Sequence, residues 1–448
     1  MSDSLIEIQG FSRLDVDKKI NLNAGVVIVL ILSFIPMFGW LVGYQFNDTE
    51  LWRAVALSLA KIGAFGGMAM FALSLILSGR YKWYDKLFGG LDKMYITHRF
   101  LGTFSLLLLL IHPISLSLLS LEGGLGASAA LWFKVSDFGV WLGAISLYLL
   151  IGLILWSVFA RAKYETFVKV HRTLGAIFIL GAVHAFMSSS ILASNSFMYW
   201  YMLTLTALGS FTFLTYSLFG DMFHRPYKYE LVKKKSYAGG IVELELAPKH
   251  RILNFVPGQF LYVQFDELES HGYHPFSISS TKRSSNLKLA IRKTGDFTNE
   301  LANMKKGATV QVKGPYGGFA LQLNANKKQL WIAGGIGVTP FLSGAKSLRH
   351  SRRNAGGDIE MIYACAEGSP YGVDELLVIE ERNDIFNVTV LDEKTFGFIN
   401  FETLVGQIKD IPDREIFICG PPAMLTNLRS QAEKMGFGHR LHYEEFTY

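Results

Sequence analysis

The sequence has little cysteine and little charge. Its only two cysteines, Cys365 and Cys419, are too few for a disulfide framework or a structural zinc site. Charged residues make up 18% of the 448 residues, and residues 21–220 hold 19 of them whereas the last 228 residues hold 54. The last part therefore has the charge content of ordinary soluble proteins, and the middle part has less than half of it. This composition excludes a disordered or fibrous protein and predicts a membrane-spanning half joined to a soluble half.

The net charge of +6 and the isoelectric point of about 9.0 raise the question of a nucleic-acid partner. The basic residues of the apolar half, however, gather at the edges of its segments, where membrane topology explains them. We therefore expect no nucleic-acid partner.

Six segments have the roughly 20 apolar residues that a helix needs to cross a lipid bilayer. They are residues 24–44, 53–78, 97–119, 137–160, 168–187 and 197–220. Lys and Arg lie mostly on one set of flanks, within residues 13–19, 80–93, 161–169 and 225–228. The positive-inside rule places these flanks, both termini and the soluble half in the cytoplasm, which suits two free cysteines. We expect a multi-pass protein of the cell (inner) membrane.

Four histidines lie inside these spans, and residues 1–220 contain no others. His98 and His112 lie on the third span, and His171 and His184 lie on the fifth. Ionisable residues in lipid are costly and usually functional. The 14 residues between His98 and His112 correspond to a rise of about 21 Å and a rotation of about 40°, so both rings share one face. The pattern predicts one haem between His98 and His171, nearer the cytoplasm, and an outer haem between His112 and His184.

The 13 residues between His171 and His184 fit this arrangement less well, because an ideal helix would leave the two rings about 140° apart. We expect Gly175 and Gly181 to permit a local unwinding, a bulge or a tilt that turns one ring. Zinc is the alternative metal, but it requires clustered ligands rather than two pairs about 20 Å apart. Haem is the better interpretation.

The soluble half changes its pattern near residue 323. Residues 225–322 alternate short β-rich runs with turns, which predicts a small antiparallel barrel. Residues 327–448 alternate apolar strands with helical stretches, as in a parallel α/β sheet. We therefore expect a cytoplasmic segment (1–23), a six-span haem-binding domain (24–222), an FAD-binding barrel (223–323) and an NAD(P)H-binding α/β domain (324–448).

Six motifs follow one another in the soluble half. They are PGQF from Pro257, HPFSIS from His274, IRKTGDFT from Ile291, GPYGGF from Gly314, AGGIGVTPF from Ala333 and CGPPAM from Cys419, and the sequence ends in EEFTY. With the histidine spacings, this order resembles the NADPH oxidase and ferric reductase superfamily over nearly all of residues 20–448, and most closely its short bacterial NADPH oxidases. The resemblance implies a six-helix transmembrane domain with two b-type haems, fused to a dehydrogenase domain similar to ferredoxin-NADP reductase.

The resemblance also implies roles for single residues. His274, Pro275, Phe276 and Ser277 line the flavin ring, with the Ser277 hydroxyl near flavin N5. Arg292, Gly295 and Thr298 hold the FAD pyrophosphate, and Gly334, Gly335, Gly337 and Pro340 bind the phosphates of the pyridine nucleotide. Cys419, Gly420 and Pro421 lie beside the nicotinamide, and Phe446 is similar to a C-terminal aromatic residue that stacks on the flavin.

These parts imply an electron path across the membrane. A reduced nicotinamide gives a hydride to FAD, which releases single electrons to the haems and then to an acceptor outside the cytoplasm. Family members that prefer NADPH have a basic residue where this sequence has Glu367, so we expect NADH to be used at least as well. Arg53 is placed either to contact the outer haem and a nascent superoxide or to anchor the span in the headgroups. Lys61, deeper in the same span, has no identifiable partner.

Three functions share these motifs. The first is superoxide production from oxygen by an NAD(P)H oxidase, and the second is reduction of ferric or cupric chelates along the same path. The third is a cytochrome subunit that feeds quinone or a partner protein. The sequence has no calcium-binding loop and no proline-rich docking segment. We therefore expect activity without an obligatory activator subunit.

Overall fold

The computed structural model forms two compact units that join at Arg225 and Pro226. It describes residues 23–43, 50–81, 83–133, 137–160, 164–188, 195–220, 225–301, 303–317, 319, 327–348, 358–365 and 371–443. The domain boundaries predicted after residues 222 and 323 lie outside these ranges. Each unit is described by itself.

The first unit is helical. Its long helices are α1 (Ala24–Gly43), α2 (Leu51–Leu77), α4 (Leu91–Ser120), α6 (Phe138–Phe159), α8 (Leu174–Ser188) and α10 (Ser196–Thr212), which continues as the π-helix η3 (Phe213–Leu218). Short elements between them are α3 (Tyr84–Phe88), η2 (Leu121–Gly123), α5 (Leu125–Phe133) and α7 (Tyr164–Arg172). Six helical segments are long and apolar enough to cross a membrane, and the fifth of them combines α7 with α8. The predicted six-span bundle is therefore confirmed.

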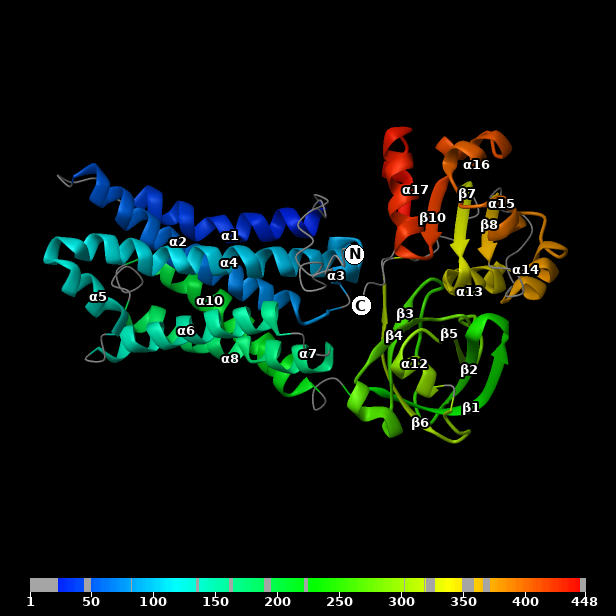
Figure 1. Ribbon diagram of the computed structural model, residues 1–448, viewed down its shortest axis with the longest axis horizontal. Helices are drawn as coiled ribbons and strands as arrows, with labels where there is room; N and C mark the ends of the chain where they lie inside the picture. The colour runs from blue at the N-terminus through cyan, green and yellow to red at the C-terminus, as the bar shows by residue number, and fades with distance from the viewer. Residues whose placement is uncertain are drawn as a thin grey trace, which may run out of the picture. The chain divides into compact units, whose positions relative to one another are not determined.

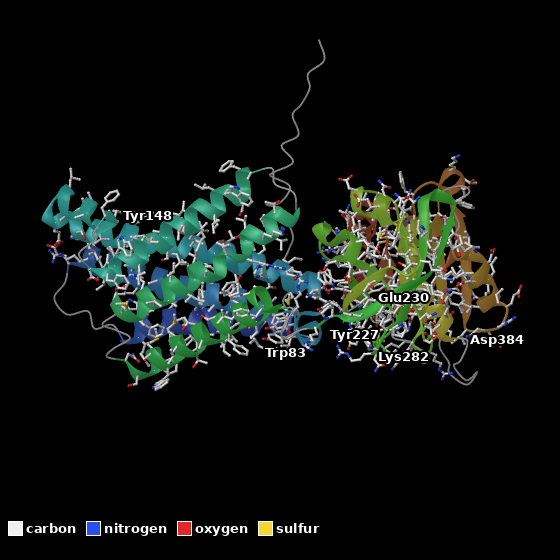
Figure 2. The ribbon with its side chains drawn as sticks, turned by 90° about the horizontal axis from the view of Figure 1, so that it is seen from below. Trp83, Tyr148, Tyr227, Glu230, Lys282 and Asp384 are labelled. Atoms are coloured by element: carbon white, nitrogen blue, oxygen red, sulfur yellow. The ribbon has the colours of Figure 1, made fainter. Side chains whose placement is uncertain are left out.

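The two ends of this bundle differ (Figure 1). One end carries α3 and α7, together with the C-terminal end of η3, from which the chain continues into the second unit. We call this the proximal end. The other, distal end carries α5 and the start of α2. Figure 2 shows Trp83 at the proximal end and Tyr148 in the part of the bundle nearer the distal end.

Small residues let α2 and α4 pack closely. Ala56, Ala60, Gly63 and Gly67 lie along one face of α2, since they are spaced by three or four residues. A Cβ at Gly63 would lie 2.6 Å from the carbonyl oxygen of Leu108. The α4 backbone therefore lies directly against α2, as in other small-residue contacts between membrane helices.

The second unit begins with six antiparallel strands. They are β1 (Tyr227–Tyr237), β2 (Ile241–Pro248), β3 (Phe260–Phe265), β4 (His274–Ser277), β5 (Leu287–Arg292) and β6 (Thr309–Tyr316), in the order β4-β3-β6-β1-β2-β5. A bridge between Ile278 and Leu289 joins the two edges of this sheet, and alternating side chains such as Leu244 and Val263 fill the interior. The predicted antiparallel barrel is confirmed.

A five-stranded parallel sheet follows. Its strands are β7 (Gln329–Gly334), β8 (Ile359–Cys365), β9 (Phe386–Asp392), β10 (Glu415–Cys419) and β11 (Leu441–Tyr443), in the order β11-β10-β7-β8-β9. The helices are α13 (Thr339–Leu348), α14 (Val373–Glu380), α15 (Glu393–Phe396), α16 (Phe401–Gln407) and α17 (Pro422–Lys434). The strand order reverses between β7 and β10, and ligands of such sheets bind at the carboxyl ends of the strands at this switch point.

The barrel and the parallel sheet are packed against each other within the second unit. Ile241 and Ala290 of the barrel belong to the same buried cluster as Trp331 and Phe341 of the parallel-sheet domain. The Ser343 hydroxyl of α13 also donates a hydrogen bond to the Ser280 carbonyl at 2.6 Å. The residues predicted to bind the flavin and those predicted to bind the nucleotide therefore belong to one body.

Candidate functional site

The four histidines of the bundle form two pairs. The ring centres of His98 (α4) and His171 (α7) lie 6.2 Å apart, with their planes at 70°. Those of His112 (α4) and His184 (α8) lie 6.4 Å apart, with their planes at 55°. All four rings are partly buried. We call these the proximal and distal pairs, after the ends of the bundle to which they are nearer.

The distance within each pair matches that of two imidazoles on one metal ion. An imidazole nitrogen lies about 2.0 Å from a bound first-row metal ion and about 1.15 Å from the centre of its own ring. Two rings on opposite sides of one ion therefore have centres about 6.3 Å apart. The distance between the rings of each pair therefore leaves room for one ion between them.

Backbone carbonyls orient three of the four rings. The Nδ1 of His98 lies 2.9 Å from the Ser74 carbonyl oxygen. The Nδ1 of His112 lies 2.9 Å from that of Ala60, and the Nδ1 of His184 lies 2.7 Å from that of Gly139. Because a carbonyl only accepts hydrogen bonds, each Nδ1 carries the proton and each Nε2 keeps its lone pair for a metal. Metal-binding histidines are typically held in this way.

His171 is held by a different contact, and it lies next to a break in its helix. Its ring stacks on Phe167, with centres 5.2 Å apart. Helix α7 ends at Arg172, Thr173 forms a turn, and α8 begins at Leu174. The amide of Thr173 bonds to the carbonyl of Val170, three residues back instead of four. The unwinding expected near Gly175 therefore lies two residues before it, and it allows both rings of this span to face α4.

The two pairs fit haem better than zinc. Among the described residues, no group of three or more His, Cys, Asp or Glu side chains could hold a metal ion together. Two neutral imidazoles on opposite sides of an ion occupy both axial positions of a haem iron, whereas a structural zinc site needs four ligands. The donor set, its spacing and its orientation thus fit one b-type haem at each level.

Arg53 lies in the first turn of α2, at the distal end. Its Nε is 2.6 Å from Oε1 of Glu122 in η2, and both side chains are partly exposed. Its guanidinium also lies 5.8 Å from the centre of the Trp52 ring. Sequence reasoning did not identify Glu122 as the partner of Arg53, because the two residues are far apart in the chain.

The residues expected to line the flavin lie on β4 and beside it. His274, Pro275, Phe276 and Ser277 are partly buried, and they pair in antiparallel register with Val263, Tyr262, Leu261 and Phe260 of β3. The His274 ring stacks on Phe297, with centres 3.9 Å apart and planes at 14°. Phe297 was not a predicted site residue, and its contact with His274 gives this short strand a fixed neighbour at the start of α12 (Asp296–Leu301).

The residues expected at the FAD pyrophosphate form a tight turn. The Thr298 hydroxyl accepts hydrogen bonds from the amides of Thr294 and Gly295, at 2.9 and 3.0 Å, and donates one to the Gly295 carbonyl. Thr298 therefore shapes the turn from within. Arg292 is the last residue of β5 and comes directly before this turn. Its Nη1 lies 3.7 Å from the position that a Cβ of Gly335 would take. The barrel and the glycine-rich turn thus meet at Arg292.

The glycine-rich turn lies at the switch point of the parallel sheet. Gly334 ends β7, Gly335 has a positive φ of 55°, and Pro340 is the second residue of α13. A Cβ at Gly337 would lie 2.3 Å from the carbonyl oxygen of Cys419, which ends β10. Only glycine allows these two loops to approach so closely. The structure brings together the two sets of residues predicted to bind the nucleotide, including Gly420 and Pro421, which follow Cys419.

Two residues with predicted roles lie outside the described residues: Glu367, predicted to favour NADH, and Phe446, predicted to stack on the flavin. The strand before Phe446 is nevertheless placed, because β11 pairs in parallel with β10 and Tyr443 lies opposite Ile418. His442 fixes this strand through its Nε2, which is 2.8 Å from a carboxylate oxygen of Glu415. The last described residue, Tyr443, therefore lies opposite the residue that directly precedes Cys419 on β10.

Comparisons with known families agree with both units. Residues 64–182 match the family described as ferric reductase like transmembrane component, and residues 227–320 match an FAD-binding domain family. Ferric reduction oxidase 8, mitochondrial, of Arabidopsis thaliana is 34% identical over 124 residues, which cover 25% of this chain and 17% of that protein. NADH-cytochrome b5 reductase 1 of Ajellomyces capsulatus is 30% identical over 178 residues, which cover 37% of this chain and 57% of that protein. The chain thus spans less than two thirds of the length of each of these two relatives.

A solved structure of ferredoxin-NADP+ reductase from Plasmodium falciparum has a TM-score of 0.43 and 20% identity, and covers 49% of this chain and 95% of that one. The two family matches, in this order, confirm the predicted resemblance to the ferric reductase and NADPH oxidase superfamily.

Proposed function

Since the chain combines the transmembrane and FAD-binding domains of the ferric reductase and NADPH oxidase superfamily, we propose that it moves electrons from NAD(P)H across a membrane through FAD and two b-type haems. The spacing of the two histidine pairs carries this proposal, because each pair has its rings 6.2 or 6.4 Å apart, a distance at which two imidazoles could hold one iron ion. The 14 residues between His98 and His112 set the two levels about 21 Å apart, a large part of the width of a bilayer core.

In this proposal the second unit collects the electrons. The loops after β7 and β10 receive the nucleotide, with the glycine-rich turn against its phosphates and Cys419 near its nicotinamide. Arg292 serves both nucleotides, since it reaches from the barrel to Gly335. Ser277 lies on β4, which is positioned by β3 and by the stacking of His274 on Phe297. FAD, when bound, converts the two electrons of a hydride into single electrons that a haem accepts.

The acceptor that we propose is oxygen, reduced to superoxide on the far side of the membrane. Reduction of ferric or cupric chelates is the second candidate, favoured by the name of the matched transmembrane family and of the Arabidopsis thaliana relative. We place the second unit and both termini in the cytoplasm, from the distribution of Lys and Arg along the sequence. Glu367 in place of a basic residue supports the use of NADH at least as well as NADPH.

The proposal is tested on the purified full chain. We expect two haems per FAD and a reduced spectrum typical of two bis-histidine haems, and a protein without them would refute the electron path. NADH oxidation is then measured with oxygen and with ferric citrate under identical conditions, together with cytochrome c reduction that is sensitive to superoxide dismutase. Sensitive reduction supports the oxidase, whereas oxidation that requires the chelate supports the metal reductase. A hundredfold preference for NADPH in kcat/KM would contradict the expectation for NADH.

A further inference from the structure

Tyr371 joins the parallel-sheet domain to the barrel through a buried hydrogen bond that the proposed electron path does not use. It follows β8 in the chain and lies two residues before α14. Its hydroxyl donates a hydrogen bond to the Glu243 carboxylate of β2, at 2.5 Å. Tyr371 is 4% exposed and Glu243 is 8% exposed. A side chain of the parallel-sheet domain is thus bonded to the barrel inside the protein.

The Glu243 carboxylate depends on this donor. A carboxylate out of water is costly unless its oxygens accept hydrogen bonds or face a cation. Its Oε2 accepts from Tyr371, and its Oε1 is 3.6 Å from the Nζ of Lys288 on β5. Burial and the neighbouring carboxylate raise the pKa of Tyr371, so the phenol keeps its proton and remains a donor. Removal of the hydroxyl would leave a buried carboxylate oxygen without its donor.

The backbone of Tyr371 is fixed to the parallel-sheet domain. Its carbonyl accepts a hydrogen bond from the Tyr363 hydroxyl of β8, at 3.3 Å. The next residue, Gly372, has a φ of 81°, and a Cβ there would lie 2.7 Å from Leu342 of α13. On the barrel side, Tyr237 at the end of β1 packs edge-on against the Tyr371 ring, with centres 4.9 Å apart. Tyr371 therefore ties the chain that follows β8 to two strands of the barrel.

Two contacts from α13 also join the barrel to the parallel-sheet domain. The Ser343 hydroxyl donates to the Ser280 carbonyl at 2.6 Å. The Lys346 ammonium donates to the Ser279 carbonyl at 3.3 Å. Helix α13 follows directly on the glycine-rich turn after β7, so this turn would stay attached to the barrel if the bond of Tyr371 were lost. The effect of that loss should concentrate at the carboxyl end of β8.

The strand order places the carboxyl end of β8 on the adenosine side of the proposed nucleotide. In the order β11-β10-β7-β8-β9, the residues proposed for the nicotinamide follow β10, and the turn proposed for the phosphates follows β7. The adenosine then extends towards β8, the next strand about 4.8 Å further along the sheet. From these observations, and on the premise of the proposed function that the nucleotide binds at this switch point, we propose that Tyr371, held by Glu243, is a positioning residue for the adenosine half of NADH.

The test compares NADH with reduced nicotinamide mononucleotide, which has the same nicotinamide but no adenosine. Flavin reduction by each is followed by anaerobic stopped flow in the purified full chain, and Tyr371→Phe removes only the hydroxyl. We expect the NADH concentration that half-saturates flavin reduction to rise about tenfold, as for one lost hydrogen bond to a charged group. The limiting rate should stay within about twofold, because the nicotinamide still reaches the flavin. The second-order rate constant for the mononucleotide should also stay within about twofold.

Three further variants make the test specific. Tyr229→Phe is the matched control, because the buried Tyr229 hydroxyl accepts a hydrogen bond from the Leu253 amide within the barrel, at 3.0 Å. It should leave both reactions unchanged. Glu243→Leu removes the acceptor and should reproduce the effect of Tyr371→Phe. The double variant should be no worse than either single variant, because both act through one bond. The FAD content of each variant reports whether it is folded.

Each outcome decides the proposal. An unchanged half-saturating concentration of NADH in Tyr371→Phe would overturn it. Equal losses with NADH and with the mononucleotide would overturn it too, because the bond would then act on the nicotinamide end. Effects of Tyr371→Phe and Glu243→Leu that add in the double variant, or loss of FAD from both single variants but not from Tyr229→Phe, would have the same consequence. A wild type whose flavin is reduced by neither nucleotide would instead refute the proposed function, which keeps the two failures distinct.

Discussion

Replacement of Gly143 by alanine should remove the distal haem and leave the proximal haem in place. Gly143 lies on α6 directly against the ring of His184, and a Cβ there would lie 2.6 Å from both Cε1 and Nδ1 of that ring. Carbon atoms in ordinary contact are about 3.5 Å apart, so the ring must move by about 0.9 Å. The only alternative is a shift of α6 itself, which carries the carbonyl that orients the same ring.

The cost of this shift follows from the hydrogen bond that it disturbs. The Nδ1 of His184 lies 2.7 Å from the Gly139 carbonyl oxygen. A displacement of about 0.9 Å along this bond would bring the distance to about 3.6 Å, which is beyond a hydrogen bond. Loss of the group that orients a metal-binding histidine typically lowers metal affinity by about 10- to 100-fold. The distal haem should therefore be lost or bound at low occupancy, while FAD and the proximal haem are retained.

The measurement is the ratio of haem to FAD in purified protein, together with the reduced haem spectrum. Gly152→Ala is the matched control, because Gly152 lies on the same helix and a Cβ there meets nothing within 4 Å. We expect about one haem per FAD in Gly143→Ala and two in Gly152→Ala. Two haems of unchanged potential in Gly143→Ala would refute the reasoning, since His184 could not then be a ligand held in the observed position.

Three further predictions concern other parts of the chain. Gly337→Ala places a Cβ 2.3 Å from the Cys419 carbonyl oxygen. The kcat/KM for NADH should therefore fall by about 100-fold at unchanged haem content. A normal kcat/KM would show that the two loops do not meet. A hydrogen bond from Arg414 lowers the pKa of Asp410 to about 2, so this carboxylate stabilises the fold above about pH 4 and the stabilisation is lost as the pH falls towards 2. Asp410→Asn should therefore lower the temperature of FAD release more at pH 7 than at pH 3, and an equal effect at both would contradict the pairing. Arg53→Ala should slow oxygen turnover roughly tenfold and leave flavin reduction by NADH unchanged, whereas unchanged turnover would favour a headgroup anchor.

The helices and the histidine pairs could be predicted from the sequence because each depends on a short-range periodicity. Hydropathy over about 20 residues gives the spans, and the spacing of His98 and His112 places both rings on one face of α4. The carbonyls that orient the rings could not be predicted, because every residue has a carbonyl and only the packing of α2 against α4 selects those of Ser74 and Ala60. For the same reason the hydrogen bond between Gly139 and His184 could not be predicted.

Other features required three-dimensional contacts. The misfit between His171 and His184 is relieved at Thr173, a residue that no turn rule singles out. Helix α5, between two predicted spans, is short and folds back on α4, where the Ser128 hydroxyl donates to the Ser117 carbonyl at 3.0 Å. The barrel and the parallel sheet followed from strand alternation, but the strand order emerged only from the pairing in the structure.

The break at Thr173 makes the two helical walls that carry the histidine pairs unequal. On one wall, α4 is continuous and carbonyls of α2 contact it at both levels, so His98 and His112 lie on one uninterrupted helix. On the other wall, a joint separates His171 from the helix that carries His184. We expect the His171 ring, which lies beside this joint, to move more readily than His98 and His112, which lie on one helix.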